Sequence, residues 1–416
     1  MKPLRILYVV SSFPSVTETF IATQVSSVKN LGYDCTIFSY QRSRDQVNHK
    51  ILTDYQLEKS VVYHFKNEAT FIKRVMGAFR FFINYFFQIR FFELLSLFNP
   101  MKLNSSRKKV QAYWDMPIFL LKKEFDIIHC HFGFNAIKLT RALRAGIVTR
   151  SKFIVTFHGS DLTPSKIEYY KDIYKDMFSC FDAFTVNTPY LRDVLMQVQP
   201  DLQPVYVHSV GFDQHYLQPF LDMKKDGSLF QMLYCGRLMK LKGPDIAIRI
   251  LHLLYQKGYH NIRLLMIGEG EMKNELLQLS QELGVSDAIN WAGALSQEDV
   301  FYNMGISDVF LYTGRVEEIT DRAETQGLVI QEAQFLKLPV IVADVGGVKY
   351  GLQEGISGYL VPPEDIHQFC SHIESFYFNE QLKIQFGQAG HDFSKNKYTT
   401  SSLVRDLMSL YLHPDH

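Results

Sequence analysis

The sequence predicts an α/β fold of two doubly wound domains, each with a parallel sheet covered by helices on both faces. Its 416 residues are enough for two domains with separate hydrophobic cores. Short apolar runs alternate with amphipathic helical segments at steady spacing, which is typical of parallel sheets. A hydrophobic content of 47% and a charged content of 21% are those of an ordinary globular protein.

Charge and cysteine usage argue against several classes of function. The 44 Lys and Arg residues nearly balance the 43 Asp and Glu residues, so nothing favours a nucleic-acid partner. The five cysteines are scattered and form no Cys-x-x-Cys pair, which indicates buried thiols in a reducing compartment. The apolar run Ile6 to Val10 is too short for a secretion signal, and no uncharged apolar stretch of about 18 residues is present. We therefore expect a cytoplasmic protein.

Residues 1–210 are expected to form the first domain. A strand at Arg5–Val10, an amphipathic helix at Thr19–Gly32 and a strand at Cys35–Ser39 make a βαβ unit. Glu18 and Thr19, at the start of this helix, are compatible with a helix cap that carries a favourable first-turn charge. Later strands are expected near residues 125–131, 153–157, 183–188 and 205–210.

Residues 71–98 contain ten aromatic side chains, including the pairs Phe81-Phe82, Phe86-Phe87 and Phe91-Phe92. In helical projection a polar stripe leaves a wide apolar face. Two interpretations of residues 71–109 stay open: an interfacial helix that touches a membrane, or a large contribution to the core. The polar stripe contains Lys73, Arg80, Asn84 and Gln88, and the cations Lys102, Arg107, Lys108 and Lys109 follow it.

Histidines lie at the ends of two expected strands. His129 and His131 are two residues apart and share a face if the strand persists; no metal site is expected, because no further ligand cluster lies nearby. We expect His129 to be structural and His131, at the edge of the following loop, to be a candidate for contact with a substrate. His158 follows the strand at residues 153–157, and Gly159 permits a close turn before Asp161, another candidate for such contact.

Residues 211–392 are expected to form the second domain, with the boundary between residues 211 and 229. Arg237 and Lys242 stand in a loop between the first strand and a helix that begins at Pro244 or Asp245, an arrangement that could hold a diphosphate. Gly268 and Gly270 follow the second strand, but a lone Gly-x-Gly is weak evidence for a phosphate loop. The expected strands lie near residues 231–235, 262–267, 288–292, 308–312, 339–343 and 358–361.

The stretch Arg315 to Asp344 combines a polar loop, a helix start and a buried strand. The loop ends at Glu324-Thr325-Gln326-Gly327, a helix begins near Leu328 and carries Glu332, and Val340–Ala343 is wholly apolar. A helix start at the carboxyl edge of a parallel sheet is a site for anionic ligands. Two glutamates eight positions apart would by themselves be ordinary surface residues.

This stretch resembles the retaining glycosyltransferases of family four, which have the two-domain GT-B fold. The resemblance spans most of the C-terminal half and is looser in the N-terminal half. There the loop before Phe20, with Glu18 and Thr19, resembles the Ser-Glu-Thr-Phe variant of exopolysaccharide-building members. The matching motifs are Glu324, Gly327-Leu328, Glu332-Ala333, Pro339 to Val342, Gly346-Gly347, Gly358 to Pro362, His158-Gly159, the Arg237-x4-Lys242 pair and Gly211-Phe212-Asp213.

The resemblance implies a role for each matched position. Arg237 and Lys242 would stabilise the leaving nucleotide, Glu324 and His158 would approach the sugar, and Glu332 would bind the ribose. Gly268, Gly270 and Gly293 would make room for the nucleoside, and Thr325 to Leu328 would contact the donor. Glu18, Thr19, His131 and Asp161 would face the acceptor. The final segment, residues 393–416, would carry a helix that crosses back onto the first domain.

The expected activity is hexosyl transfer from a nucleotide-sugar, favoured as UDP-linked, to a saccharide or lipid-linked saccharide acceptor in polysaccharide biosynthesis. The donor is a co-substrate, and no cofactor or metal is expected because protein cations would balance the diphosphate. The protein would be cytoplasmic or peripheral on the cytoplasmic face of the membrane. Two alternatives stay open: a nucleotide-sugar epimerase of the same fold, and a catalytically silent scaffold in polysaccharide assembly.

Overall fold

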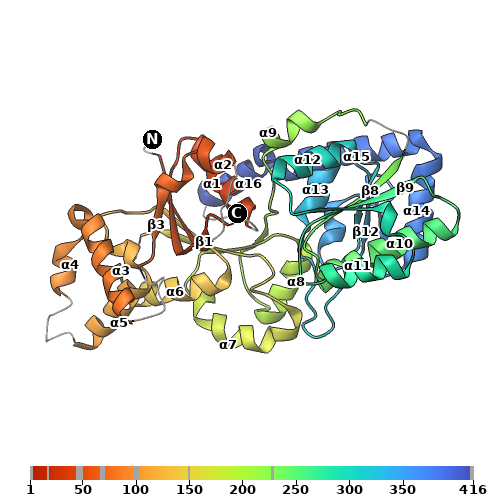
Figure 1. The fold of residues 1–416 in the computed structure, drawn as a ribbon. Helices are drawn as coiled ribbons and strands as arrows, with labels where there is room; N and C mark the ends of the chain where they lie inside the picture. Colours follow the sequence, from red (N-terminus) through yellow and green to blue (C-terminus); the bar gives the residue numbers. More distant parts are fainter. Residues whose placement is uncertain are drawn as a thin grey trace.

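The computed structural model describes residues 3–15, 18–43, 50–65, 71–96, 103–148, 150–225 and 229–412. They form two α/β units, each built on one parallel sheet, which confirms the predicted fold class (Figure 1). Lys102 and the other residues of 97–102, part of the predicted aromatic segment, lie outside the described residues. Within the described chain, no helix is long and apolar enough to cross a membrane.

The first sheet has seven parallel strands in the order β3-β2-β1-β4-β5-β6-β7. The strand order reverses between β1 and β4, and in doubly wound sheets ligands bind at the carboxyl ends of the strands beside such a reversal. The three-residue β3 was absent from the predicted strands, because so short an apolar run carries no periodicity. The strands are β1 (Arg5–Phe13), β2 (Asp34–Arg42), β3 (Val61–Tyr63), β4 (Ile127–His131), β5 (Lys152–Phe157), β6 (Ala183–Val186) and β7 (Val205–Val207).

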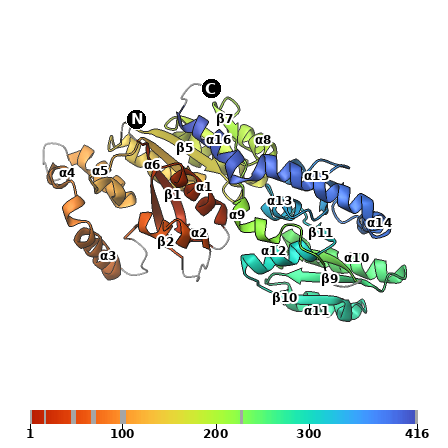
Figure 2. The same ribbon diagram turned by 90° about the horizontal axis from the view of Figure 1, so that it is seen from above.

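Helices cover both faces of this sheet, and three of them project from its end away from the second unit (Figures 1 and 2). The helices are α1 (Thr19–Asn30), α2 (Lys50–Asp54), α3 (Phe71–Asn84), α4 (Phe91–Ser96), α5 (Leu103–Asp115), α6 (Gly133–Arg144), α7 (Ile167–Phe178) and α8 (Pro189–Val198). Short 3₁₀ turns are η1 (Leu57–Ser60), η2 (Phe86–Gln88), η4 (Pro117–Leu120) and η5 (Pro164–Lys166).

The second sheet has six parallel strands in the order β10-β9-β8-β11-β12-β13, with the reversal between β8 and β11. All six predicted strands are present. They are β8 (Phe230–Cys235), β9 (Ile262–Ile267), β10 (Ile289–Gly293), β11 (Val309–Tyr312), β12 (Val340–Ala343) and β13 (Gly358–Val361). The helices are α9 (Gln214–Leu217), α10 (Pro244–Gln256), α11 (Lys273–Glu282), α12 (Gln297–Ile306), α13 (Leu328–Phe335), α14 (Ile366–Phe378), α15 (Glu380–Tyr398) and α16 (Thr400–Leu412). The 3₁₀ turns are η6 (Gln218–Phe220), η7 (Lys240–Lys242), η8 (Ser286–Ala288) and η9 (Val348–Gly351).

The chain crosses between the two units twice, and the crossings are hydrogen-bonded to each other. The Phe212 N–H donates to the Tyr398 carbonyl at 3.1 Å, and the Thr400 N–H donates to the Phe212 carbonyl at 3.0 Å. Beyond this point α16 packs beside α1 (Figure 2), and its residues Leu407 and Tyr411 are buried in the core of the first unit. The predicted return of the C-terminal helix is therefore confirmed.

Candidate active site

Three loops at the carboxyl edge of the second sheet are hydrogen-bonded into one surface. The Gly236 N–H donates to the Ile267 carbonyl at 3.0 Å, and the Gly268 N–H donates to the Gly293 carbonyl at 2.8 Å. A Cβ atom on Gly268, which has a φ of 141°, would collide with the Gly236 carbonyl, and one on Gly270 would collide with the Leu238 carbonyl. These glycines therefore let the loops after β8 and β9 approach each other, and their role beside a nucleoside stays a prediction.

Lys242 and Glu324 form an ion pair across the reversal of the second sheet, from the loop after β8 to the loop after β11. The Tyr312 hydroxyl donates to the same Glu324 carboxylate at 3.3 Å. Burial acts to raise the pKa of Glu324, but Lys242, Tyr312 and the Thr325 N–H together outweigh burial and lower it. The Glu324 carboxylate is therefore held charged. The sequence predicted that Lys242 and Glu324 both face the donor, and in the structure the two side chains face each other.

Arg237 lies in the same loop, with its side chain exposed. Among the described residues, none accepts a hydrogen bond from its guanidinium group. Lys240 of this loop is also exposed. The loop is fixed beneath them, because the Thr313 hydroxyl donates to the Gly243 carbonyl at 2.7 Å and the Arg315 N–H donates to the Leu241 carbonyl at 3.0 Å.

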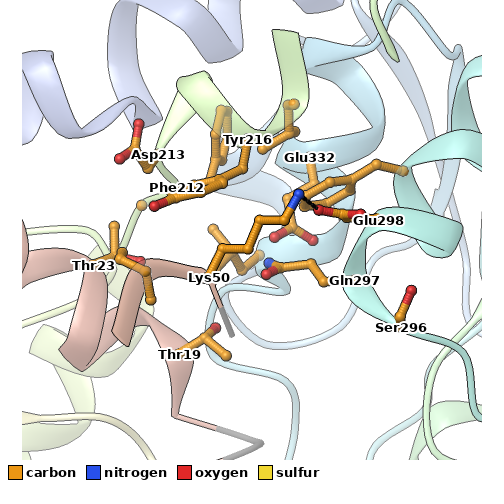
Figure 3. A pocket seen from close by; sticks show the side chains of 15 residues that line it. Thr19, Thr23, Lys50, Phe212, Asp213, Tyr216, Ser296, Gln297, Glu298 and Glu332 are labelled. Atoms are coloured by element: carbon orange, nitrogen blue, oxygen red, sulfur yellow. Dashed lines mark ion pairs between the residues drawn. The ribbon is translucent and has the colours of Figure 1, made fainter. Parts of the chain in front are cut away.

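Glu332 projects from α13 into a cavity of about 220 Å³ between the two units (Figure 3). Thr19 and Thr23 of α1 line the opposite side, and Lys50 of α2 forms an ion pair with Glu298 of α12 across it. Burial raises the pKa of Glu332 to about 8. Glu332 is thus a predicted donor-site residue that faces an interdomain cavity.

Glu332 and Lys242 both act on Cys235, the last residue of β8. The pKa of the Cys235 thiol is raised to about 12 by burial, with a smaller raising effect of Glu332 and a lowering effect of Lys242. Both charged groups therefore lie within electrostatic reach of Cys235. Leu328, at the start of α13, lines the same cavity as Glu332. The first N–H groups of α13 have no acceptor within the helix, as at any helix start.

Thr325 and Gln326 bind the first unit instead of facing a ligand. The Thr325 hydroxyl donates to the His158 carbonyl at 3.0 Å. The Gln326 side chain accepts from the Val210 N–H at 2.9 Å and donates to the Val210 carbonyl at 2.7 Å. The polar atoms of these two side chains therefore have partners in the neighbouring unit. Donor contact at Thr325 and Gln326 stays a prediction.

The Gly346-Gly347 turn supports this docking. The Gly347 N–H donates to the Glu324 carbonyl at 2.8 Å. A Cβ atom on Gly347 would collide with the Thr325 carbonyl, which also accepts from the Thr188 hydroxyl at 2.8 Å. Gly327, with a φ of 74°, turns the chain into α13 just after this contact. Glycine at these positions therefore sets the path of the Glu324 loop.

His158 stands at the end of β5, packed between the rings of Phe20 and Phe132, each with its centroid 4.7 Å away. His131 Nδ1 lies 3.0 Å from His158 Nε2. Burial lowers the pKa of His131 to about 3 and also lowers the pKa of His158, so both rings are neutral near pH 7. His131 is fully buried, so the expected acceptor contact is wrong, and this ring supports His158 instead.

His129 is structural, as predicted. Its Nδ1 lies 2.7 Å from the Tyr411 hydroxyl of α16, and its Nε2 lies 2.6 Å from the Thr156 hydroxyl. Its ring stacks on that of His131 with centroids 4.7 Å apart, which confirms that the two share a face of β4. Burial lowers the pKa of His129.

Asp161 is fully buried and holds the loop together. One carboxylate oxygen accepts from the Gly133 N–H at 2.7 Å, and the other accepts from the N–H groups of His158 and Gly159 at 3.0 and 3.1 Å. Acceptor contact by Asp161 is therefore wrong, because both oxygens are engaged. Glu18 precedes α1 without a side-chain cap bond, and burial, with Asp161 nearby, raises its pKa to about 7.

Several residues of this region were missed by the sequence reasoning. Tyr312 and Asn187 lie at strand ends, and this position is the sequence signal that could have identified them. The Asn187 amide donates to the Thr325 hydroxyl at 3.0 Å. Lys50 and Glu298 carry no such signal, because they belong to surface helices that meet only in three dimensions. Over the part of the chain that the structure describes, no group of three His, Cys, Asp or Glu side chains could hold a metal ion.

Comparison with known proteins gives matches over nearly the whole chain. A family model for glycosyltransferase family 4 matches residues 17–215, and one for glycosyl transferases group 1 matches residues 222–393. The amylovoran biosynthesis glycosyltransferase AmsK of Erwinia amylovora is 24% identical over 380 residues, covering 87% of this chain and 88% of its own. The human alpha-1,3/1,6-mannosyltransferase ALG2 is 23% identical over 318 residues, covering 70% and 74%.

Solved structures agree on the fold. The Anabaena protein HepE, determined in complex with UDP, has a TM-score of 0.70 at 14% identity and covers 98% of this chain and 99% of its own. A glycosyltransferase from Rickettsia africae has a TM-score of 0.71 at 18% identity and covers 98% of both chains. Two consecutive family models and two facing parallel sheets lead to one conclusion. The chain belongs to the GT-B glycosyltransferases of family four.

Proposed function

We propose that the chain transfers a hexose from a UDP-sugar to a saccharide or lipid-linked saccharide acceptor in polysaccharide biosynthesis, with retention of anomeric configuration. The observation that carries this proposal is the grouping of Arg237, Lys242, Glu324 and Glu332 around the carboxyl ends of β8 and β11. The naming of AmsK as an amylovoran biosynthesis enzyme and the UDP complex of HepE support the acceptor class and the nucleotide.

The chemical demand on the enzyme is to stabilise a departing nucleoside diphosphate. Arg237 offers a planar fork of donors that suits two phosphate oxygens, and Lys242 offers a point charge. The N–H groups and positive dipole end at the start of α13 add to this potential. Lys242 would exchange part of its contact with Glu324 for the diphosphate, which leaves the carboxylate free to accept from sugar hydroxyls.

We propose that these protein cations balance the diphosphate without a metal ion or other cofactor. The support is the chemistry of the loop, because Arg237 and Lys242 supply the charge that a divalent cation would otherwise bring. Glu332, from the α13 side, would accept hydrogen bonds from the ribose hydroxyls. A carboxyl group with a raised pKa can do so in either protonation state.

Retention is proposed without an enzyme nucleophile. Glu324 is paired with Lys242 of the proposed diphosphate site, and Lys242 and Tyr312 stabilise its charge and reduce its nucleophilicity. Departure of the diphosphate and attack of the acceptor on the same face needs no covalent intermediate, since the leaving phosphate can accept the acceptor proton. His158, held by His131, would contact the sugar from the first unit.

The acceptor would bind on the first unit, beside Glu18 and Thr19. Thr19 faces the interdomain cavity, and Glu18 has a buried carboxylate oxygen for which no described residue is a partner. We place the protein in the cytoplasm, peripheral to the membrane that would carry a lipid-linked acceptor.

Calorimetry against UDP-, GDP- and ADP-sugars, followed by product analysis, tests the proposal. We expect a UDP-sugar to bind and its sugar to appear on the acceptor with retained configuration. A free epimerised nucleotide-sugar would favour an epimerase, and failure of every nucleotide to bind would favour a silent scaffold. Preference for a GDP-sugar would overturn only the choice of UDP as the nucleotide, and the proposed transfer reaction would stand.

A further inference from the structure

Helices α3 and α4 lie at the end of the first unit farthest from the second (Figures 1 and 2). They and the turn η2 carry several exposed apolar side chains. Phe87 and Phe92 are 88% and 90% exposed, although Phe side chains belong to the types most often buried. We call these exposed side chains the aromatic surface: Ile72, Met76, Phe79, Ile83, Phe87 and Phe92.

Helix α3 is apolar on two sides, and only one of them is used by the fold. Phe81 is buried against Phe65, with ring centroids 5.8 Å apart, and a Cβ atom on Gly77 would collide with the Phe65 carbonyl. The exposed residues 72, 76, 79 and 83 follow the spacing of one separate helical stripe. The core interpretation is therefore confirmed for one side of α3. The other side is exposed among the described residues, and its contact with a membrane stays a prediction.

The charge around the aromatic surface is strongly one-sided. The described residues 71–96 and 103–115, which include α3, α4 and α5, contain seven Lys or Arg residues and two acids, Glu93 and Asp115, whereas the whole chain has a net charge of only +1. Arg80, Arg107 and Lys108 are exposed. Glu93 is already paired, because it accepts from Arg90 at 3.2 Å and from the Tyr113 hydroxyl at 2.6 Å.

We propose that the aromatic surface docks on a lipid bilayer with anionic headgroups, its apolar side chains among the acyl chains and its cations at the headgroups. A second copy of the chain is disfavoured, because a two-fold interface would place two cationic surfaces against each other. The proposal extends the proposed function, since a peripheral enzyme held at the membrane would meet lipid-linked acceptors there.

Vesicle co-sedimentation of the full chain, without donor or acceptor, tests this docking. We expect binding to vesicles of phosphatidylcholine with about 30% phosphatidylglycerol, and weaker binding to pure phosphatidylcholine or in high salt. The double variant Phe87→Ser/Phe92→Ser should weaken binding by about tenfold or more. Its matched control is Ile319→Ser/Phe378→Ser, because those side chains are 90% and 70% exposed on the second unit.

A second pair of variants separates charge from apolar contact. The double variant Arg107→Gln/Lys108→Gln should bind anionic vesicles about fivefold more weakly for each cation removed, and its binding to neutral vesicles should not change. Lys175→Gln/Lys224→Gln, two exposed cations elsewhere, should bind as the wild type does.

Three results would overturn the docking: no binding to either vesicle, equal loss in the aromatic variant and its control, or a wild-type dimer that Phe87→Ser/Phe92→Ser converts to a monomer. Transfer to a soluble acceptor is measured separately, so failure of the docking and failure of the transferase are distinguishable.

Discussion

His131 Nδ1 lies 3.0 Å from His158 Nε2, and the two imidazole rings are stacked at an angle of 11°. A single N–H bridges two neutral rings, so the tautomers of the two histidines are coupled and His131 restrains the orientation of His158. His131→Phe should therefore lower kcat on the order of tenfold, because a misplaced group next to the reacting sugar costs rate. The KM for the donor should stay unchanged.

Steady-state kinetics of His131→Phe and the conservative variant His131→Asn check this positioning role. The amide of Asn can keep a hydrogen bond to His158, so partial rescue of kcat is expected. If both variants lose the same activity and the same melting temperature, the role of His131 is only structural.

Lys242 and Glu324 are each largely buried, with side-chain exposures of 20% and 18%. Lys242→Met leaves a buried carboxylate unpaired, which should cost about 2 kcal/mol, below the 3–5 kcal/mol of a fully enclosed pair. The double variant Lys242→Met/Glu324→Gln should recover most of that loss, since no buried charge is left. Urea unfolding at pH 7 measures both.

The unfolding free energy lost in Lys242→Met should depend on pH. Since the pair lowers the folded-state pKa of Glu324, its stabilisation is present above the ordinary carboxyl pKa and is lost as pH falls through the lowered value. Equal stability of Lys242→Met and the wild type at pH 7 would contradict the role of the pair.

For Glu332 we expect folding stability to depend on pH in the opposite direction. Its folded-state pKa is raised to about 8, so its stabilising effect is complete below the ordinary value near 4.5 and is lost as pH rises through 8. The melting temperature of the wild type should thus fall relative to Glu332→Gln between pH 5 and pH 9, by about 3 °C or more. Glu271→Gln, an exposed acid of the same domain, should track the wild type. Parallel curves for all three proteins would rule out a buried neutral carboxyl.

Arg237 and Lys240 are exposed cations of one loop, and only Arg237 is assigned to the diphosphate. Arg237→Ala should lower kcat/KM at least tenfold, equivalent to about 1.4 kcal/mol, while Lys240→Ala should change it little. Initial rates with the best donor of the panel check this. An unchanged rate in folded Arg237→Ala, or equal losses in both variants, would remove Arg237 from the site.

The parallel sheets were predictable because their strands are short, wholly apolar runs between amphipathic helices. Val340–Ala343 and Ile262–Ile267 have this pattern, and both lie where it places them. The grouping of Lys242 with Glu324 could also be predicted, since both residues follow strands beside the reversal of the same sheet.

The rest of the site depends on contacts between loops, both within the first unit and between the two units. Thr325, Gln326, His131 and Asp161 have the residue types of ligand contacts, but each is hydrogen-bonded to another part of the protein. Sequence spacing fixes which strand end a side chain follows. It does not fix whether the neighbouring surface is a ligand or another loop.

The sequence by itself determined two doubly wound domains, the strand ends that carry polar side chains and the presence of an aromatic, cationic segment, because these depend on local periodicity and composition. Only the tertiary structure decided that Lys50 reaches Glu298, that His131 supports His158 and that one side of α3 stays uncovered. The physical reason is that each of these depends on how elements distant in sequence pack together, and packing is set by the whole chain.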